Sequence, residues 1–350
     1  PRGRRGPTLP AATMQPATQD IRSNDLDVTC TVRVNSPSDV RNAVRALYTA
    51  TWPGEAFTPV ARAFLDLELA FSGRLQGYHG LDTVYHDQQH TLDVTLAMSR
   101  LMAGYERVHA GTPRALGGER AAVGILLALF HDIGYLRTQD EPVANGAEFT
   151  RSHVSRSAHF MDRHLPALGY GHWTPVTREI VHFTGYEKPF AQIVAATPDP
   201  LDVQLGHLLG TADMVAQMAD RCYLEKCRDR LYPEFVLGGV ALPIGGRHPA
   251  VRYASGLDLL RQTPLFMEET RRKRLDEGFA KAYRYFEPLF DGRNPYVESM
   301  DRNLGFLKQV LRTENWLRLR RHPQRVAEPA ETLGNVRGLM TDYFRKAWLS

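Results

Sequence analysis

Histidine and aspartate residues that could bind a metal recur between His86 and Asp213. The segment 85–94 reads YHDQQHTLDV, and its two histidines are four residues apart. We expect this segment to be helical, which places both imidazoles on one face. Further along the chain, His131-Asp132 ends an apolar segment and Asp213 interrupts another. An ionised carboxylate in an apolar core is costly unless it is paired or bound to metal, so these positions indicate a metal site.

Six residues form the candidate ligand set. They carry imidazole or carboxylate groups and fall on five successive expected helices: His90, His131, Asp132, His153, His182 and Asp213. A lone histidine on an apolar face is more often a core residue than a ligand, but packing alone does not explain this combination. The donors suit Fe, Mn, Zn and similar divalent ions, and a carboxylate can bridge two of them. One ion with an open catalytic position needs fewer ligands, so we predict two divalent transition-metal ions, with Fe or Mn favoured over Zn or Mg.

These residues, in this order, resemble the HD superfamily of metal-dependent phosphohydrolases, in which His131-Asp132 would be the name-giving pair. The resemblance covers about residues 85–213, and the motif YHxxxHxxDV at 85–94 is similar to the signature of class I cyclic-nucleotide phosphodiesterases. It implies an all-α HD-domain helical bundle, to which the C-terminal part of the chain adds further helices. It also implies a dinuclear metal-dependent phosphohydrolase that acts on a nucleotide-type phosphodiester such as a cyclic nucleotide.

The resemblance assigns a role to each of these residues. His86 would be the general acid that protonates the leaving oxygen, and Asp132 would bridge the two ions and so take part in catalysis. The first metal site would consist of His90, His131, Asp132 and Asp213. His153 and His182 have counterparts in HD-GYP-type cyclic-dinucleotide phosphodiesterases, where they hold the second metal.

The chain departs from both family patterns at a few positions. Class I enzymes have Asn where this chain has Asp87, and they usually follow the His-Asp pair with a further His, where Tyr135 and Leu136 stand here. The segment 182–186, HFTGY, matches only part of the HD-GYP sequence. The superfamily is therefore better defined than the substrate.

Two enzyme classes and one binding function are compatible with the ligand set. In a hydrolase, a metal-bridging hydroxide would attack phosphorus while His86 protonates the leaving alkoxide. The alternative is an HD-type mixed-valence di-iron oxygenase, which has the same ligand order and acts on polyols or phosphonates. An oxygenase has no leaving alkoxide to protonate, so His86 favours hydrolysis. A third possibility is a module that only senses a nucleotide, and the intact ligand set argues against it.

Positive charge near the metals would be needed to bind a phosphate. Arg137 follows the His-Asp pair closely and Lys188 follows His182 by six residues, so both are candidate substrate-binding residues or plain surface residues. The net charge is +4, and basic runs at 271–274 and 312–325 are either solvated helix faces or a patch that attracts anions. We expect a small-molecule phosphoester as partner and no duplex nucleic acid, and the oligomeric state stays open.

The first part of the chain differs in composition from the rest. Residues 1–25 are rich in Pro, Gly, Arg and Thr and show no periodicity, so we expect residues 1–37 to be a disordered extension. Met14 is a candidate natural start, with an added stretch before it. Within the extension, VTCTVRV at 28–34 alternates as a short strand would.

The remainder has helical periodicity. We expect an HD-type catalytic core at 38–232 and a helical segment at 233–350 that packs on it. Helices are expected after Ser36-Pro37 and Thr58-Pro59, and over 83–105, 119–131, 148–165, 175–183, 201–231, 264–290 and 295–321. On the second of these helices, the expected core-facing residues are Phe64, Leu65, Leu67 and Leu69.

Composition limits the cellular context. The longest apolar run, residues 121–130, is too short to span a bilayer, and the beginning of the sequence lacks the apolar core of a signal peptide. The three cysteines show no zinc-type pairing. We therefore expect a cytoplasmic protein with reduced cysteines and no membrane partner.

Overall fold

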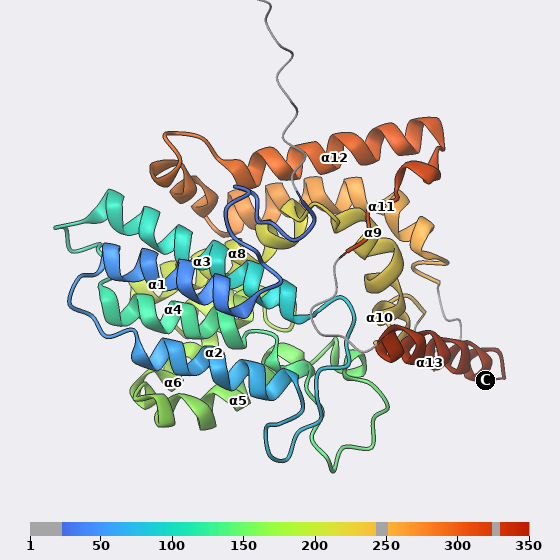
Figure 1. The fold of residues 1–350 in the computed structure, drawn as a ribbon, viewed down its shortest axis with the longest axis horizontal. Coiled ribbons are helices and arrows are strands. Elements are labelled where there is room, and N and C mark those ends of the chain that lie inside the picture. The colour runs from blue at the N-terminus through green and yellow to red at the C-terminus, as the bar shows by residue number, and fades with distance from the viewer. Residues whose placement is uncertain (1–22, 243–250, 324–329, 350) are drawn as a thin grey trace, which may run out of the picture.

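The computed structural model describes residues 23–242, 251–323 and 330–349. These residues form thirteen α-helices and several short 3-10 or π segments, with no strand, which confirms the all-α prediction (Figure 1). The α-helices are α1 Pro37–Thr51, α2 Thr58–Phe71, α3 Gln88–His109, α4 Gly118–Phe130, α5 His153–His164, α6 Thr174–Ile180, α7 Phe190–Ala195, α8 Pro200–Ala219, α9 Tyr223–Lys226, α10 Tyr232–Leu237, α11 Gly256–Glu269, α12 Pro295–Thr313 and α13 Ala330–Leu349. The short segments are η1 Ile133–Tyr135, η2 Gly146–Phe149, η3 Leu165–Leu168, η4 Gly171–Trp173, η5 Val181–Thr184, η6 Cys227–Leu231, η7 Thr270–Gly278, η8 Ala282–Leu289 and η9 Trp316–Arg318.

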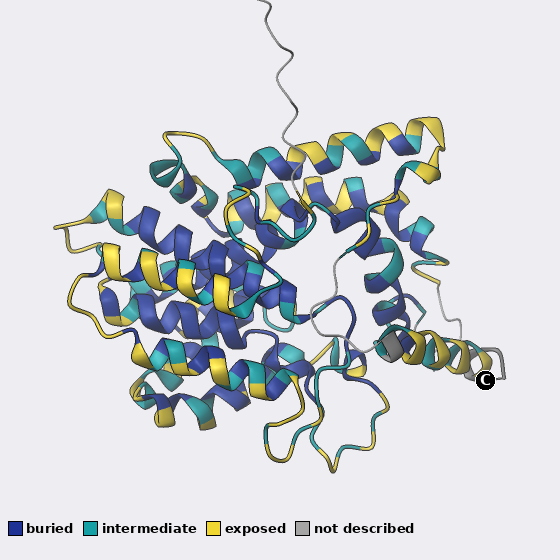
Figure 2. Cartoon of the chain, in the orientation of Figure 1, coloured by how far each residue is buried: buried dark blue, intermediate teal, exposed yellow. Residues whose placement is uncertain are grey.

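Helices α3, α4 and α8 form the centre of the molecule. Helix α3 packs against α8, α4, α1 and η8, and nearly every residue from Gln89 to Tyr105 is buried (Figure 2). Apolar and small residues occur on every face of the helix, as expected for a helix that is enclosed on all sides, and they are joined by a few buried polar residues such as His90 and Arg100. The candidate ligands on α3 and α8 and at the end of α4 are therefore attached to buried helices.

Several sequence signals for helix starts are confirmed. The Ser36 side chain caps α1 by accepting the Asp39 N–H, and α2 begins at Thr58. The expected core face of α2 is partly wrong, because Leu65 is 50% exposed and Leu69 is 37% exposed. The buried stripe follows the 3.6-residue period instead, and it consists of Val60, Ala63, Phe64, Leu67 and Ala70.

The start of α3 differs from the expectation in a way that matters for the site. The helix begins at Gln88, and Asp87 is its N-cap, with the side chain accepting the His90 N–H at 2.8 Å. His86 therefore precedes the helix, so the expectation that His86 and His90 share a helix face is wrong. An acidic side chain at this position satisfies one of the free N–H groups of the first turn, which is why the helix starts here and not at Thr83.

Part of the expected disordered extension is folded. Asp27 is only 2% exposed, and it accepts backbone N–H groups from Thr31 and Val32 and pairs with Arg100 at 2.7 Å. Residues 23–36 thus form a tight turn fixed to α3, with a single bridge between Leu26 and Arg33 in place of the expected strand. Residues 1–22, with the candidate start at Met14, lie outside the described residues.

The helix expected over 201–231 is interrupted at Asp220. Helix α8 ends at Ala219, where Asp220 adopts an extended conformation, caps the Cys222 N–H and pairs with Lys226 at 2.7 Å. After it, α9, η6 and α10 follow without a gap. The expected domain boundary at 232 therefore falls at the first residue of α10, inside a continuous helical stretch.

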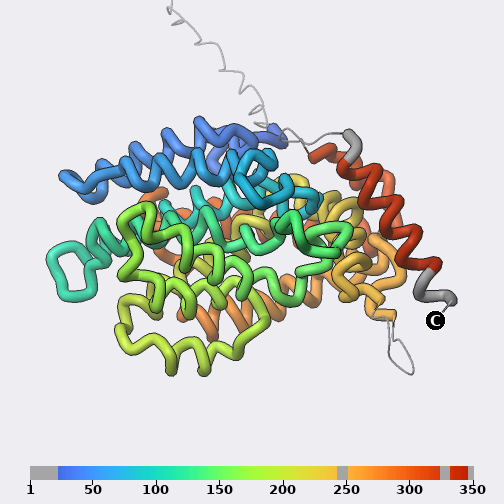
Figure 3. The backbone as a smooth tube through the Cα atoms, turned by 90° about the horizontal axis from the view of Figure 1, so that it is seen from below, coloured from blue at the N-terminus to red at the C-terminus, as the bar shows by residue number. Residues whose placement is uncertain are grey.

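The C-terminal part covers one side of the central helices. Asn303 of α12 donates to the carbonyls of Met218 and Asp220 at the end of α8. Helix α11 begins at Gly256, where Ser255 caps the Asp258 N–H, and so runs well before the expected start at Pro264. Figures 1 and 3 both show α13 at one end of the molecule. It packs on α10.

Among the described residues, no helix combines the length and apolar character needed to cross a bilayer. The three cysteines are free: Cys30 is exposed, and Cys222 and Cys227 are buried. The prediction of unpaired cysteines is therefore consistent with the positions they occupy.

Candidate metal centre

The His-Asp pair lies at the end of α4, where the chain leaves the helix. His131 is the C-terminal cap residue of α4, and Asp132 precedes the short turn η1. The His131 Nδ1 lies 2.8 Å from the Ala128 carbonyl, so it carries the proton and donates it there. The Nε2 of His131 is then free as a ligand atom, 3.2 Å from Asp132 Oδ2 and 3.9 Å from Asp213 Oδ1. Fixing the tautomer in this way is typical of metal-binding histidines.

His90 joins this group from the first turn of α3. Its Nε2 lies 3.4 Å from Asp132 Oδ2 and 3.4 Å from Asp213 Oδ1. The ligand atoms of His90, His131 and Asp213 all lie within 4.8 Å of one another, and the three side chains are buried. Gln217, one turn after Asp213 on α8, donates to Asp213 Oδ1 at 3.4 Å. This cluster could hold a metal ion, as the sequence predicts.

The electrostatics of the cluster are those of a cation site. Burial alone would lower the pKa of His90, but the nearby carboxylates of Asp132 and Asp213 raise it to about 10. Burial also opposes the charged form of His131, and the Asp132 charge raises its pKa instead. Burial would raise the pKa of Asp132, but His131 and His90 hold it well below its usual range. A positive charge is thus favoured between these carboxylates, and a divalent ion would supply it.

The second oxygen of Asp132 faces another histidine. His153, at the start of α5, places its Nε2 3.5 Å from Asp132 Oδ1. Its Nδ1 lies 2.9 Å from the Thr150 carbonyl, an arrangement that again leaves Nε2 free. Asp132 therefore divides its two oxygens between His153 on one side and His90 with His131 on the other, which is the arrangement that a bridging carboxylate needs.

Gly134 allows α5 to come this close. A Cβ atom at Gly134 would lie 1.9 Å from the His153 carbonyl oxygen and 2.8 Å from the Arg156 Cβ. The Gly134 N–H donates to Ser157 Oγ at 2.9 Å, and its carbonyl accepts from Arg156 Nε. Any side chain at this position would separate α5 from the His-Asp turn, so Gly134 sets the distance between His153 and Asp132.

His182 lies on η5, directly after α6, and is buried. Its Nδ1 has no hydrogen-bond partner among the described residues and lies 4.0 Å from Glu187 Oε2. Burial, and next the charge of Lys188, lower the pKa of His182. His153 is also among the charges that act on it. His182 is thus near His153, but within the described residues no ion pair of 4.0 Å or less joins it to Asp132.

Unpartnered buried atoms indicate how well the residues fit a metal. Three polar side-chain atoms at this place are buried without a hydrogen-bond partner within the described residues: His131 Nε2, Asp132 Oδ2 and His182 Nδ1. Leaving such groups unsatisfied is costly. Ligation would satisfy the first two atoms, so the donor set fits a divalent transition-metal ion.

His86 is held beside the cluster by Glu234, a residue that the sequence analysis did not identify. The His86 Nδ1 lies 2.6 Å from Glu234 Oε2, and the backbone N–H groups of Val84, Tyr85 and His86 all donate to Glu234 Oε1. Glu234 is fully buried on α10. It lies 148 residues from His86 in the chain, so no local pattern links the two.

Tyr135 was noted in the sequence only as a departure from the class I pattern. Its ring stacks on both His86 and His153, with centroid distances of 4.5 and 4.4 Å and interplanar angles of 19° and 16°. The Tyr135 ring therefore packs against both imidazoles. A tyrosine that follows a His-Asp pair carries no signal of such a role, because stacking depends on the path of α5.

The two expected substrate-binding residues have partners of their own. Arg137 Nε lies 2.8 Å from Asp82 Oδ2, and the same guanidinium donates to the Val143 carbonyl. Lys188 Nζ lies 2.8 Å from Glu179 Oε2. Both contacts fix loops near the ligands, and the role of these residues toward a substrate stays a prediction.

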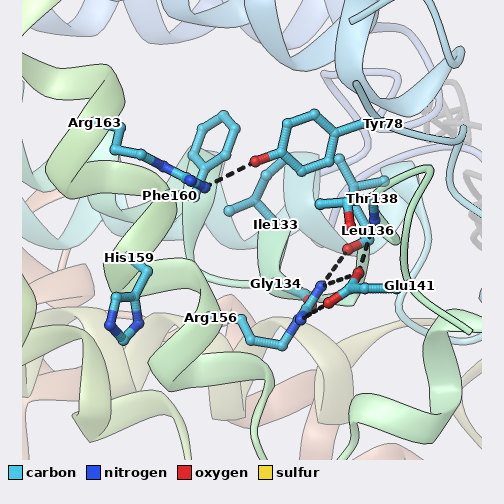
Figure 4. A pocket seen from close by; sticks show the side chains of 10 residues that line it. All are labelled: Tyr78, Ile133, Gly134, Leu136, Thr138, Glu141, Arg156, His159, Phe160 and Arg163. Atoms are coloured by element: carbon cyan, nitrogen blue, oxygen red, sulfur yellow. Dashed lines mark hydrogen bonds and ion pairs between the residues drawn. The ribbon is translucent and has the colours of Figure 1, made fainter. Parts of the chain in front are cut away.

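A pocket of about 350 Å³ lies behind the His-Asp turn. It is lined by Ile133 and Gly134 of η1, by side chains of α5 and by the loop that contains Tyr78 (Figure 4). Arg156 and Glu141 form an ion pair on one side, and Arg163 bonds the Tyr78 hydroxyl on the other. None of the lining residues is a candidate ligand, so this pocket is distinct from the metal cluster.

Comparisons of the chain with protein-family models, with curated proteins and with solved structures found no match to any of them.

Proposed function

We propose that this chain is a dinuclear metal-dependent phosphohydrolase that hydrolyses a nucleotide-type phosphodiester. The observation that supports it most strongly is the division of Asp132. Its Oδ2 faces His90 and His131, and its Oδ1 faces His153. A two-ion clamp around one carboxylate is the arrangement used to displace groups at phosphorus.

Two groups of residues would hold the ions. The first position would use His90, His131, Asp132 and Asp213, and the second would use Asp132, His153 and His182. When bound, divalent ions at these positions would lower the pKa of a water molecule and neutralise charge on the phosphoryl group. The buried surroundings exclude bulk water and strengthen the interaction of these carboxylates with any cation.

His86 would donate the proton that the leaving oxygen needs. Glu234 accepts a hydrogen bond from His86 Nδ1, which leaves Nε2 to carry the transferred proton. The imidazole stacks on Tyr135 and lies with its centroid 5.9 Å from that of His90 and 6.1 Å from that of His153. The charge of His86 is also among those that lower the pKa of Asp132. A proton donor thus lies beside the ligands without serving as one.

The test is a substrate screen on protein loaded with Mn²⁺, Fe²⁺ or Mg²⁺. We expect phosphate-ester hydrolysis of cyclic mononucleotides, cyclic dinucleotides or a nitrophenyl phosphodiester, and we expect Asp132→Ala to abolish it. Exposed Asp140 provides the control variant, Asp140→Ala, which should keep full activity. Oxygen consumption by the iron-loaded protein without phosphoester hydrolysis would reject the proposal and support the oxygenase alternative.

A further inference from the structure

An exposed aromatic side chain lies next to the second group of ligands. Tyr186 is 72% exposed, although it follows the buried residues of η5, which contains His182. An exposed aromatic ring that is held in a fixed position beside a candidate site can offer a flat surface to a ligand. Its surroundings show that the ring is held.

The loop that carries Tyr186 is fixed to the start of α5. Glu187 accepts the backbone N–H groups of Val154 and Ser155 at 2.8 and 3.0 Å. A Cβ atom at Gly185 would lie 2.6 Å from Val154 Cγ2, so the backbone of this loop is packed closely on α5. The residues on both sides of Tyr186 therefore contact the turn that begins at His153.

Arg274 supports the ring from behind. Its guanidinium carbon lies 4.3 Å from the Tyr186 ring centroid, and the same group lies over the rings of Phe190 and Phe279 at 4.9 and 5.6 Å. Arg274 also donates to the carbonyls of Phe183 and Gly185 at 2.7 and 3.0 Å, and it is buried. The cation is thus locked in place, and the tyrosine is oriented before any ligand arrives.

Tyr186 lies close to the second group of ligands. It follows His182, on η5, by four residues, and both of its chain neighbours contact the first turn of α5, which begins at His153. The ring is therefore held beside the two histidines that would bind the second ion.

We propose that Tyr186 is the platform on which a planar group of the substrate stacks, and that this group is a nucleobase. The inference rests on the proposed function, since it names the part of the substrate that lies outside the phosphodiester. A fixed aromatic ring with solvent in front of it offers every base a π-face, and such stacking tolerates different bases. Tyr186 would therefore select nucleotides over other phosphoesters without selecting one base.

The test compares two phosphate ligands that differ only by a base. Binding of AMP and of ribose 5-phosphate is measured by calorimetry on wild-type protein, Tyr186→Ala and Tyr186→Phe. We expect Tyr186→Ala to weaken AMP binding by roughly 10-fold or more and to leave ribose 5-phosphate unchanged, and we expect Tyr186→Phe to retain both affinities. Leu317→Ala, at a position that is 88% exposed on η9, is the matched control for loss of an exposed apolar side chain and should change neither affinity.

Other results would overturn the inference. Equal weakening of both ligands in Tyr186→Ala, no weakening of either, or no binding of AMP to the wild type would each do so. Arg274→Lys keeps the charge but loses the planar support, so it should weaken AMP binding less than Tyr186→Ala does. A melting curve checks that this buried change leaves the protein folded.

Failure of the proposed function gives a different result. One outcome is that no phosphodiester is hydrolysed, but AMP still binds more tightly than ribose 5-phosphate and this preference depends on Tyr186. The stacking role of Tyr186 is then supported and the hydrolase proposal is rejected. If cyclic nucleotides are hydrolysed and Tyr186→Ala leaves their KM unchanged, the platform alone fails. If both proposals are correct, Tyr186→Ala should raise KM for cyclic nucleotides much more than it lowers kcat.

Discussion

The two sides of Asp132 differ in the charges that surround them. On the Oδ2 side, His90 and His131 face two carboxylates, and these carboxylates raise the pKa of both imidazoles despite burial. On the Oδ1 side, burial dominates and lowers the pKa of His153 and His182. The Oδ2 side therefore favours a positive charge even without a metal ion, whereas the Oδ1 side presents neutral imidazoles. The difference indicates that the first position would bind an ion more tightly and that the second ion would exchange more readily.

The largest effect should come from Asp132, because it belongs to both sides. We expect Asp132→Ala to lower metal affinity at both positions by roughly 100-fold or more and to abolish turnover. Metal content after gel filtration, measured by mass spectrometry beside the Asp140→Ala control, checks this. Full metal occupancy in Asp132→Ala would show that Asp132 does not bridge the two sides.

The next effect concerns His86, which lies close to both sides without belonging to either. His86→Ala should keep both ions and lower kcat by roughly 10²–10⁴-fold, the usual contribution of a positioned proton donor. Glu234→Gln should give a smaller loss in the same direction, because the ring remains but loses its orienting carboxylate. Both losses should shrink for a nitrophenolate leaving group, which needs no proton. An equal loss for good and poor leaving groups would reject the general-acid role.

Single histidine variants should separate the two sides. We expect His131→Ala to weaken the tight position and His153→Ala to weaken only the exchangeable one, each by roughly 10–100-fold in metal affinity. Titration of metal-stripped protein with Mn²⁺ would resolve the two affinities. His159→Ala is the control for His153→Ala, since His159 lies one to two turns later on the same helix and is exposed. If both ligand variants weaken the same position, the two sides are not separate sites.

The smallest effect is a difference in proton release. His90, with a pKa of about 10, is protonated at pH 7 and must lose its proton before it binds an ion. Affinity at the first position should therefore rise by about tenfold per pH unit from pH 7 toward pH 10. The lowered pKa values of His153 and His182 leave them neutral above pH 6.5, so the second position should not respond there. Calorimetry in buffers of different ionisation heat measures the number of protons released when an ion binds at each position. Equal numbers for the two positions would contradict the difference between the two sides of Asp132.

The cluster of His90, His131 and Asp213 could be predicted from the sequence because its chemistry is visible in the residue types. A carboxylate within an apolar helix, such as Asp213, has few explanations other than a charged partner. The start of α3 was missed because the pattern of apolar residues extends beyond Asp87, and only the capping contact shows where the helix begins. His86 was thus linked to His90 for the wrong geometric reason.

Other features depend on contacts between distant segments, which no local pattern reports. Glu234 reaches His86 from α10, and its acidic side chain looks like any other helix residue in the sequence. Tyr186 and Arg274 meet in the same way across the fold. The turn at Asp27 falls within the extension that was expected to be disordered, and the ion pair with Arg100 that fixes it cannot be seen along the chain.

The close approach at Gly134 would make the proposed second ion dependent on the absence of a single methyl group. Because a Cβ atom there would overlap the His153 carbonyl, even alanine would push α5 outward and carry His153 away from Asp132. His90, His131 and Asp213 belong to other helices and would keep their positions. If two ions bind as proposed, Gly134→Ala could therefore leave room for only one of them. The metal stoichiometry would change while every candidate ligand stays in the sequence.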